Sequence, residues 1–413
     1  MRILILSQYF YPEIFRINDL VQELVTRGHE VTVLTGLPNY PDGSIYESYK
    51  ADPSLFSEYR GAKVIRVPIL PRGNAGGLSL FFNYLSFAFM ASFYGAWKLR
   101  GQSYDAIFVC QLSPVTVGLP AVLLRYLKRA PMIFWVQDLW PDTLAALGII
   151  NSRFNLALVG IVVRFIYKYS DLILVQSTGF ISGVEKYVAN KKKISYFPNW
   201  AESALKIDGV SPAPEIPIND RGVFRIIFTG NIGEAQDFPA VIEAANVLKN
   251  YSMIKWYIIG QGSMSKWVEE RISFLGLENN VLMLGQLPLE RMPSIYKCAD
   301  ILLVSLQDRP IFSMTIPSKV QAYLASGRPI VGMLGGEGAE VIKRSRSGFV
   351  CRSGDYNNLA KLIIKLSGMP KEELLRMGQD GRNYGQEHFD RNRLISMLEK
   401  YLSTVKFGDN KKS

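Results

Sequence analysis

The feature that most constrains the fold is an alternation of apolar runs with amphipathic helical segments, which occurs twice along the chain. The first series opens with the apolar run at 3–6, a helical pattern that Gly28 ends, and the run "EVTVLT". The second opens with "FRIIFTGNIGE", a helix expected over 238–249, and "IKWYIIG". Strand, helix and strand in close succession form a βαβ unit, whose right-handed crossover makes the strands parallel. The sequence therefore predicts two doubly wound α/β domains in series.

A polar, proline-rich segment separates the two series. It runs from Ala201 to Gly222 and contains "DGVSPAPEIPINDRG", a composition typical of linkers. The expected domains are therefore 1–200 and 223–385, with 201–222 as the linker. A chain of 413 residues is long enough for each domain to bury its own core. Ligands of open parallel sheets bind at the carboxyl ends of the strands, so we expect a cleft between two facing rims.

Charge and cysteine content narrow the class of protein. The net charge of +11 suits nucleic acid, anionic lipid or a phosphorylated substrate. No zinc finger, RNA-recognition signature or arginine-rich helix is present, so no nucleic-acid partner is expected. Cys110, Cys298 and Cys351 lack metal spacing, and two histidines exclude a three-histidine metal site. The opening "MRILILSQYF" suits a buried strand better than a secretory signal, and we expect a cytoplasmic protein.

Residues 78–99 form the most apolar stretch of the chain. Ser79, Asn83, Ser86 and Ser92 interrupt it, and the next strand continues the same sheet, so we expect no transmembrane span. Two interpretations remain open. The helix is either a core helix packed on the sheet, or it also presents aromatic side chains to a membrane surface, with basic residues near its ends.

Polar residues follow several strands of the first domain. Glu13 and Arg16 lie beside aromatic residues in the first rim loop, and Asn39 lies in the second, "GLPNYPDG". Asp138 follows the central strand "MIFWV", where a carboxylate could accept a proton or orient an acceptor hydroxyl. Capping of the next helix is the alternative role, which we assign instead to Asp142.

A phosphate site is expected in the second domain. In "IPSKVQAYLASGRPI", Pro317 and Ser318 begin a helix, Ser318 offers a capping hydroxyl, and Lys319 adds a cation at the positive end of the helix dipole. In "TGNIGEAQDF", glycines let the backbone approach a diphosphate closely; the residues are Gly230, Gly233 and, in the same loop, Gln236. With Glu340 after "GGEG", these residues indicate a nucleotide diphosphate. No Walker A motif, GxGxxG opening or GxSxG elbow competes with this interpretation.

A set of motifs carries a family resemblance over almost the whole chain. The motifs are "GHEVTVLT", "DLILVQST", "FPNW", "FTGNIG", "NVLMLGQLP", "YKCADILLVSL" and "PSKVQAYLASGRPI". The chain resembles family 4 glycosyltransferases of the GT-B fold. The segments "LSQYFYPEIFRINDL", "LTGLPNYPDG" and "VQDLWPDT" are more narrowly similar to WbuB-type N-acetyl-L-fucosaminyltransferases of O-antigen and capsule synthesis.

The resemblance implies an activity and its partners. It implies transfer with retention of configuration from a UDP-sugar held by the second domain. The acceptor would be a lipid-linked saccharide of the undecaprenyl type, bound by the first domain at the inner face of the cytoplasmic membrane. A final helix within 386–405 would pack back on the first domain, leaving 406–413 as a tail. The absence of an Asp-x-Asp pair favours metal-independent transfer without a cofactor.

The sequence departs from the family pattern at two places. The usual Glu-x7-Glu pair falls on Met314 and Ala322, so Gln321, Ser318 and Glu340 are the candidates to replace its contacts. The usual Arg and Lys after the first strand fall near Asn231 and Asp237, which leaves Lys319 as the phosphate cation and Arg309 as the second choice. We therefore expect UDP to be held by a set of second-domain residues, with the base near Gln286: Gly230, Asn231, Gln236, Ser318 and Lys319.

Three alternatives stay open. A UDP-sugar 2-epimerase also uses two facing domains, but two histidines and the missing Glu pair count against it. A sugar-nucleotide sensor without activity would explain the missing carboxylates. Transfer of another sugar, such as mannose or N-acetylglucosamine, is an alternative within the same class, because a few loop contacts set specificity.

Overall fold

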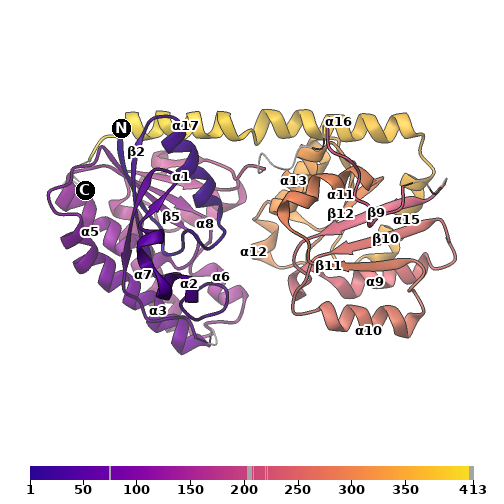
Figure 1. The fold of residues 1–413 in the computed structure, drawn as a ribbon, viewed down its shortest axis with the longest axis horizontal. Helices are drawn as coiled ribbons and strands as arrows, with labels where there is room; N and C mark the ends of the chain where they lie inside the picture. The colour runs from indigo at the N-terminus through magenta and orange to yellow at the C-terminus, as the bar shows by residue number, and fades with distance from the viewer. Residues whose placement is uncertain (74–75, 202–206, 208, 219, 221, 409–413) are drawn as a thin grey trace. The chain divides into compact units, whose positions relative to one another are not determined.

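The protein forms two compact units, each with its own sheet (Figure 1). The computed structural model describes residues 1–73, 76–201, 207, 209–218, 220 and 222–408. One unit comprises residues 1–197 and the residues from 395 onward, and the other comprises 198–394. Several positions of the expected linker, 202–206, 208, 219 and 221, lie outside the described residues. Ala213 and Ile216, within the same segment, are buried in a core cluster of the second unit.

The first unit is built on an eight-stranded sheet in the order β3-β4-β2-β1-β5-β6-β7-β8. Neighbouring strands pair in parallel, except that β3 and β4 form an antiparallel hairpin at one edge. The central strands β1, β5, β6 and β7 are apolar apart from Arg2 and Gln111 at strand ends, because helices cover both faces. The strands are β1 (Arg2–Leu6), β2 (Glu30–Gly36), β3 (Glu58–Tyr59), β4 (Ala62–Val67), β5 (Ala106–Gln111), β6 (Met132–Val136), β7 (Leu172–Val175) and β8 (Ile194–Tyr196).

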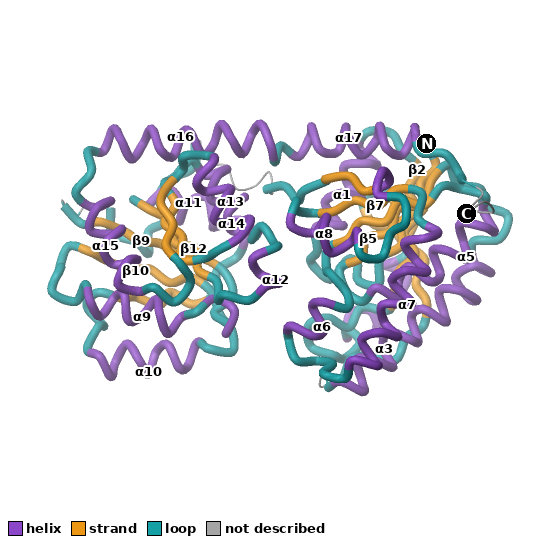
Figure 2. Tube along the Cα trace, turned by 180° about the vertical axis from the view of Figure 1, so that it is seen from behind, coloured by secondary structure: helices purple, strands orange, loops and turns teal. Residues whose placement is uncertain are grey.

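Amphipathic helices cover this sheet, as Figure 2 shows. In α1, buried Ile17, Leu20, Val21 and Leu24 recur at helical spacing, which explains why this segment packs on the strands. The helices are α1 (Arg16–Thr26), α2 (Glu47–Ala51), α3 (Gly77–Met90), α4 (Ala96–Lys98), α5 (Gly118–Lys128), α6 (Asp142–Ala146), α7 (Arg153–Tyr169), α8 (Gly179–Glu185) and α17 (Arg391–Thr404). A wider helical turn, η2 (Ala91–Gly95), joins α3 to α4, and 3-10 turns are formed by η1 (Pro53–Phe56), η3 (Val115–Val117) and η4 (Lys191–Lys193).

The second unit has a six-stranded parallel sheet in the order β11-β10-β9-β12-β13-β14. Its strands are β9 (Phe224–Thr229), β10 (Ile254–Ile259), β11 (Val281–Gly285), β12 (Ile301–Ser305), β13 (Ile330–Met333) and β14 (Gly348–Cys351). Its helices are α9 (Phe238–Val247), α10 (Ser265–Leu275), α11 (Met292–Cys298), α12 (Pro310–Ser313), α13 (Ser318–Ser326), α14 (Gly336–Arg344), α15 (Tyr356–Ser367) and α16 (Lys371–His388). Two 3-10 turns, η6 (Glu234–Gln236) and η7 (Leu289–Arg291), begin helical segments.

These sheets confirm the predicted pair of doubly wound domains. Individual helix ends differ from expectation. The helix predicted over 238–249 ends at Val247. The final helix, expected within 386–405, runs from Arg391 to Thr404. The C-terminal part of α17 belongs to the first unit, where Glu399 accepts a hydrogen bond from Arg27 (2.8 Å) and lies 2.8 Å from His29 Nε2.

Candidate functional site

The loop after β9 brings backbone unusually close to its neighbours. Gly230 has φ of +114°, a conformation that glycine adopts without strain, and a Cβ atom there would lie 2.6 Å from Cε of Lys319. Gly260, at the end of β10, lies so close to the Gly230 carbonyl that any side chain would collide with it. The two loops are also joined by a hydrogen bond from Gly230 N–H to the Ile259 carbonyl (2.8 Å). The backbone at Gly230, which carries no side chain, therefore lies directly beside Lys319.

Lys319 lies in the first turn of α13, whose first residue is Ser318. Its Nζ is buried and has no hydrogen-bond partner among the described residues. The nitrogen lies 3.7 Å from the centroid of the Phe228 ring, on β9. Burial lowers the Lys319 pKa to about 7. A buried ammonium without an acceptor is costly, so this site favours an anion that supplies one.

The helix start adds to the positive field. The first N–H groups of an α-helix lack intrahelical partners and carry partial positive charge, which makes this end suited to phosphate. The predicted capping role of Ser318 is wrong, because Pro317 occupies the cap position and no side chain caps the helix. The Ser318 side chain is exposed and therefore accessible to a ligand.

Two other predicted residues shape the loop itself. The Gln236 carbonyl Oε1 accepts hydrogen bonds from the N–H of Gly233 (3.1 Å) and from Asn231 Nδ2 (3.3 Å), which closes the turn η6. The backbone carbonyl of Gln236 also accepts a hydrogen bond from Ser305 Oγ (2.6 Å), which ties the loop to β12. Gln236 therefore holds the loop in shape, and its contact with nucleotide stays a prediction.

Gln321 and Gln286 are placed differently. Gln321 is buried, and its Nε2 donates to the Asn199 carbonyl at 2.8 Å, while its Oε1 has no partner among the described residues. Gln286 is exposed and follows β11, whose Gly285 carbonyl accepts a hydrogen bond from Gly260. Gln321 shares helix α13 with Lys319, and Gln286 follows the residue that bonds to Gly260. The role of both in holding the nucleotide stays a prediction.

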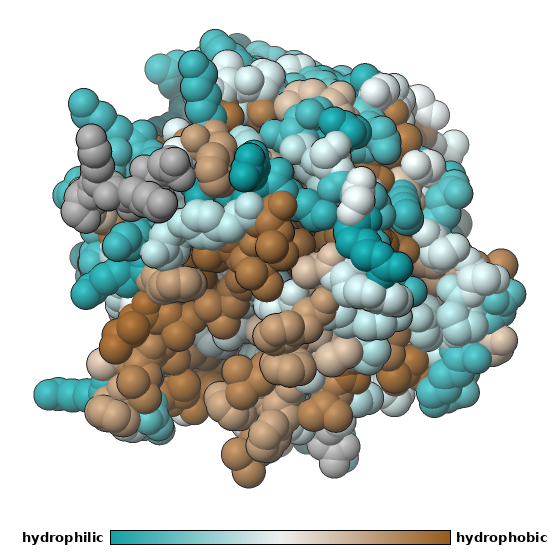
Figure 3. Space-filling model, turned by 90° about the vertical axis from the view of Figure 1, so that its left-hand side faces the viewer, coloured by the Kyte–Doolittle hydropathy of each residue, from teal (hydrophilic) through white to brown (hydrophobic). Residues whose placement is uncertain are grey.

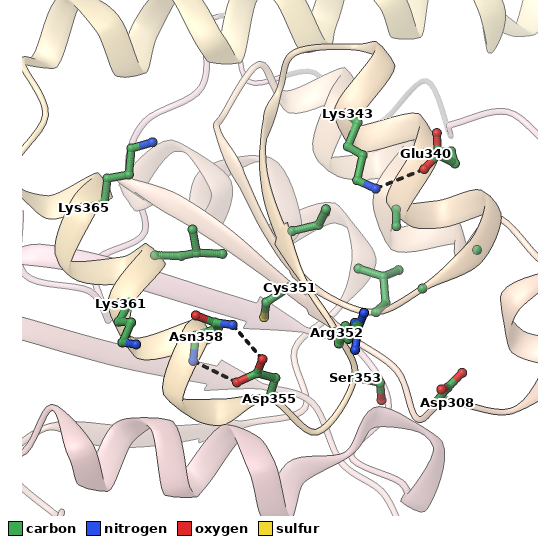
Figure 4. Close-up of a pocket in the computed structure, with 16 residues that line it drawn as sticks. Asp308, Glu340, Lys343, Cys351, Arg352, Ser353, Asp355, Asn358, Lys361 and Lys365 are labelled. Carbon is green, nitrogen blue, oxygen red and sulfur yellow. Dashed lines mark hydrogen bonds and ion pairs between the residues drawn. The ribbon is translucent and has the colours of Figure 1, made fainter.

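Glu340 lines a cavity of about 850 Å³ at the carboxyl ends of β13 and β14 (Figure 4). It pairs with Lys343 on the same helix at 3.1 Å, and Arg352 and Asp308 lie on the cavity wall. The first turn of α14 connects this cavity to the helix start of Lys319, because a Cβ at Gly338 would lie 2.8 Å from Pro317. Glu340 thus lies on the helix whose first turn packs against Pro317, and its contact with a nucleotide stays a prediction.

In the first unit, Glu13 and Asn39 organise the rim loops. The Glu13 carboxylate accepts hydrogen bonds from the N–H groups of Phe10 (3.0 Å), Asn39 (2.8 Å) and Tyr40 (2.8 Å). Burial raises its pKa, because desolvation disfavours the charged form. Asn39 is fully buried and its Oδ1 accepts from the Arg72 N–H at 3.2 Å. Their contact with an acceptor therefore stays a prediction.

Aromatic rings and a cation lie directly beside these loops. The Tyr9, Phe15 and Tyr40 rings have centroids 5.2 to 5.8 Å apart. The Arg72 guanidinium lies 4.9 Å from the Tyr40 ring centroid, and its Nε is buried without a hydrogen-bond partner among the described residues. Arg16, the third predicted acceptor residue, begins α1 in the same rim. Sequence reasoning missed Arg72 as a site residue, although a basic residue after a strand was the available signal.

Asp138 lies in the rim after β6, as predicted. Its Oδ1 accepts from Thr143 Oγ1 (2.5 Å) and its Oδ2 from Trp140 Nε1 (3.0 Å). Burial raises its pKa. The capping role assigned to Asp142 is wrong, because Pro141 is the cap and Asp142 pairs with Lys186 at 3.1 Å. A catalytic role for Asp138 stays a prediction.

Gln111 is a rim residue that the sequence reasoning missed. It ends β5, next to β6, and is fully buried, yet neither of its side-chain amide atoms has a partner among the described residues. A buried amide without partners costs free energy, so a ligand or water at this rim would be stabilising. A polar residue that ends an otherwise apolar strand was the signal.

Within the described part of the chain, no group of three or more His, Cys, Asp or Glu side chains is arranged to hold a metal ion.

Comparisons with known proteins agree with this architecture. A putative colanic acid biosynthesis glycosyl transferase, WcaI of Escherichia coli K12, is 28% identical over 79% of this chain and 82% of its own length. The structure of Anabaena HepE in complex with UDP superposes with a TM-score of 0.70 over 98% of this chain and all of that one, at 14% identity. WaaG, a glycosyltransferase involved in lipopolysaccharide biosynthesis, gives a TM-score of 0.65 over 99% and 100%, at 15% identity.

The family models cover both units. Residues 15–200 match the glycosyl transferase 4-like domain, and residues 215–384 match glycosyl transferases group 1. The fold is the expected GT-B fold. The chain is therefore a glycosyltransferase composed of a glycosyl transferase 4-like domain followed by a glycosyl transferases group 1 domain.

Proposed function

We propose that this enzyme transfers a sugar, with retention of configuration, from a UDP-sugar to a lipid-linked saccharide acceptor in bacterial polysaccharide synthesis. The observation that carries the proposal is the buried Nζ of Lys319 at the start of α13, which has no hydrogen-bond partner in the described part of the chain and lies beside the backbone of Gly230. Relatives named for colanic acid and lipopolysaccharide synthesis, and a neighbour solved with UDP, support the substrate classes.

The diphosphate would lie between the Gly230 loop and the N-terminus of α13. There it would accept hydrogen bonds from the helix N–H groups, Ser318 and Lys319. As the bond from the anomeric carbon to the diphosphate breaks, negative charge grows on the leaving oxygen, and Lys319 and the helix dipole stabilise it. In the first unit, Asp138 would orient the acceptor hydroxyl or receive its proton. No metal ion is required for these steps.

The donor sugar is proposed as N-acetyl-L-fucosamine, because the rim motifs are similar to those of WbuB-type enzymes. Mannose or N-acetylglucosamine remain alternatives within the same reaction class. The enzyme would act from the cytoplasm as a peripheral protein at the inner face of the cytoplasmic membrane, where a lipid-linked acceptor is available.

The first test is thermal stabilisation without metal by UDP, GDP and dTDP and by their sugars. A ligand that binds only the native state raises the melting temperature by mass action, so the nucleotide preference is read directly. Stabilisation by UDP and UDP-N-acetyl-L-fucosamine alone is the expected result. Stabilisation by GDP alone would remove the donor assignment. Binding without turnover on any lipid acceptor would favour the sensor, and release of an epimerised UDP-sugar would favour the epimerase.

A further inference from the structure

Three helical segments of the first unit, the continuous α3–η2–α4 segment (77–98), α5 and α7, expose an unusually large number of apolar side chains. On α3, η2 and α4 they recur at helical spacing, so they form one stripe: Leu78, Phe81, Phe82, Leu85, Phe89, Phe93 and Trp97. A second stripe on α7 contains Phe154, Leu158, Ile161 and Phe165, and α5 adds Leu123, Tyr126 and Leu127. Leu78 is 77% exposed, Phe154 72% and Phe93 63%, values expected of charged residues rather than of leucine or phenylalanine.

The stripes form one surface, because α5 contacts both α3 and α7. Figure 3 shows apolar residues gathered over one broad area, on the side of the unit where Figure 1 labels these helices. We call this area, made of the exposed apolar residues of α3 to α5 and α7, the apolar face. Contiguous apolar areas of this kind on a soluble domain mark an interaction site.

The charge around the apolar face has one sign. No Asp or Glu occurs in residues 77–100, 118–130 or 152–170, which span the three helices and their ends. The next acidic residue after α7, Asp171, is buried in an ion pair with Arg125 at 2.7 Å. The cations of the three segments other than Arg125 are Lys98, Arg100, Lys128, Arg129, Arg153, Arg164 and Lys168. An apolar area with a basic rim is complementary to an anionic surface with an apolar interior.

Trp97 lies at the end of the first stripe, beside two of these cations. Lys98 Nζ lies 5.3 Å and the Arg100 guanidinium 4.5 Å from its ring centroid. An indole ring beside basic side chains suits the headgroup level of a bilayer, where one part of the residue is apolar and the other is hydrated. A second copy of this chain would bring like charges together, which disfavours self-association through the same face.

We propose that the apolar face is a docking surface for an anionic phospholipid bilayer, on which the first unit lies without crossing it. Among the described residues, the segment 77–98 is the one helix long and apolar enough to span a membrane. Its opposite side is built into the domain, however. Phe87 is fully buried, and the Asn83 side chain accepts from Gln8 Nε2 (2.7 Å) and donates to the Leu70 carbonyl (2.5 Å).

The docking surface adjoins the acceptor rim. Arg72, just before α3, donates from its backbone N–H to Asn39, and its guanidinium lies over Tyr40. A bilayer against α3 would therefore present its headgroup layer to the rim where the acceptor is proposed to bind. This inference deepens the proposed function, since it names the surface on which a lipid-linked acceptor would be met.

The test is flotation of the full chain with vesicles of 70% phosphatidylcholine and 30% phosphatidylglycerol, compared with pure phosphatidylcholine. The wild-type protein should float with the anionic vesicles, and binding should weaken as salt rises. Phe81→Ser/Phe89→Ser/Phe93→Ser on α3 and Phe154→Ser/Ile161→Ser on α7 should each lower the partition coefficient by about tenfold or more, since each side chain would leave the lipid. Leu55→Ser/Phe274→Ser, at two exposed apolar positions outside the face, should bind like wild type.

Three results would overturn the proposal. They are a wild-type protein that stays at the bottom of the gradient, face variants that float like wild type, and a wild-type dimer that the face variants convert to monomer. Stabilisation by UDP is measured on each variant in parallel and should be unchanged. Failure of docking with intact UDP binding therefore counts against the surface alone, and docking without UDP binding counts against the proposed donor alone.

Discussion

At the scale of single residues, Lys319 combines two opposed properties. Its Nζ is buried with no hydrogen-bond partner among the described residues, which destabilises the folded protein, and in the proposed site the same nitrogen would meet the anionic leaving group. Buried charged groups that lack partners are found mainly where function requires them. Phe228 offsets part of the cost, because its ring face attracts the ammonium at 3.7 Å.

Replacement of Lys319 should therefore separate stability from activity. Lys319→Met keeps a long, unbranched side chain and removes its charge. It should therefore raise the stability of the ligand-free protein by about 1–3 kcal/mol at pH 6. The same change should lower turnover by about 10² or more, if the ammonium meets charge that grows in the transition state. Denaturant unfolding and single-turnover kinetics measure the two effects. A loss of turnover of only a few-fold would remove Lys319 from catalysis.

The Lys319 pKa of about 7 predicts a pH dependence of donor binding. The diphosphate of a UDP-sugar keeps its charge between pH 6 and 9, and it stabilises the ammonium form of Lys319. Below pH 7 the free enzyme already carries the ammonium, so affinity should be constant there. Above pH 7 the neutral amine must take up a proton on binding, so affinity should fall by up to about tenfold per pH unit.

Calorimetry at pH 6.5 and 8.5, in buffers of different ionisation enthalpy, checks this dependence. Proton uptake should be much larger at pH 8.5, where the free amine is mostly neutral, than at pH 6.5. Lys319→Arg is the control, because a guanidinium stays charged throughout and should make affinity independent of pH. Equal affinity of the wild-type enzyme at both pH values would contradict the protonation of Lys319 on binding.

At the scale of elements, the contact of α5 with α7 depends on the absence of a side chain. A Cβ at Gly118 would lie 2.5 Å from Ile166 Cγ2 and 2.9 Å from the Phe134 ring, which are both buried. Gly118→Ala should therefore destabilise the protein by about 1–3 kcal/mol through overpacking. Gly77→Ala, at the open start of α3, is the matched control and should be neutral or slightly stabilising. Equal unfolding midpoints for the two variants would contradict the close approach.

Elements that depend only on neighbouring residues in the sequence could be predicted from it. The apolar strands, the helix α13 and the position of Lys319 in its first turn follow from periodicity, Pro317 and Gly327. What could not be predicted depends on distant partners. Asp138 and Asp142 are both suited to capping, and only the positions of Thr143 and Lys186 decide what each one does. Phe228 is a second example. The sequence shows it only as an apolar strand residue, and its contact with the Lys319 ammonium is visible only in the structure.

At the scale of the whole molecule, the chain passes between its two units twice, near residues 197 and 394. The second passage brings the C-terminal part of α17 to the first unit, where Ile395 and Leu398 are fully buried and Glu399 pairs with Arg27 and His29. The first unit therefore depends on residues that follow the whole of the second unit in the sequence.

This connectivity predicts that the two units respond to different perturbations. Leu398→Ala should destabilise the first unit by about 2–5 kcal/mol, because a fully buried leucine leaves a cavity. UDP should stabilise the second unit, which contains Lys319. Hydrogen exchange distinguishes them, since the variant should speed exchange in β1, β5 and β6 while UDP slows it in β9 and β12. Lys400→Ala, at an exposed position on the same helix, should change neither. If Leu398→Ala sped exchange equally in β9 and β12, the two units would unfold together, and the closing helix would stabilise the entire enzyme rather than its first unit.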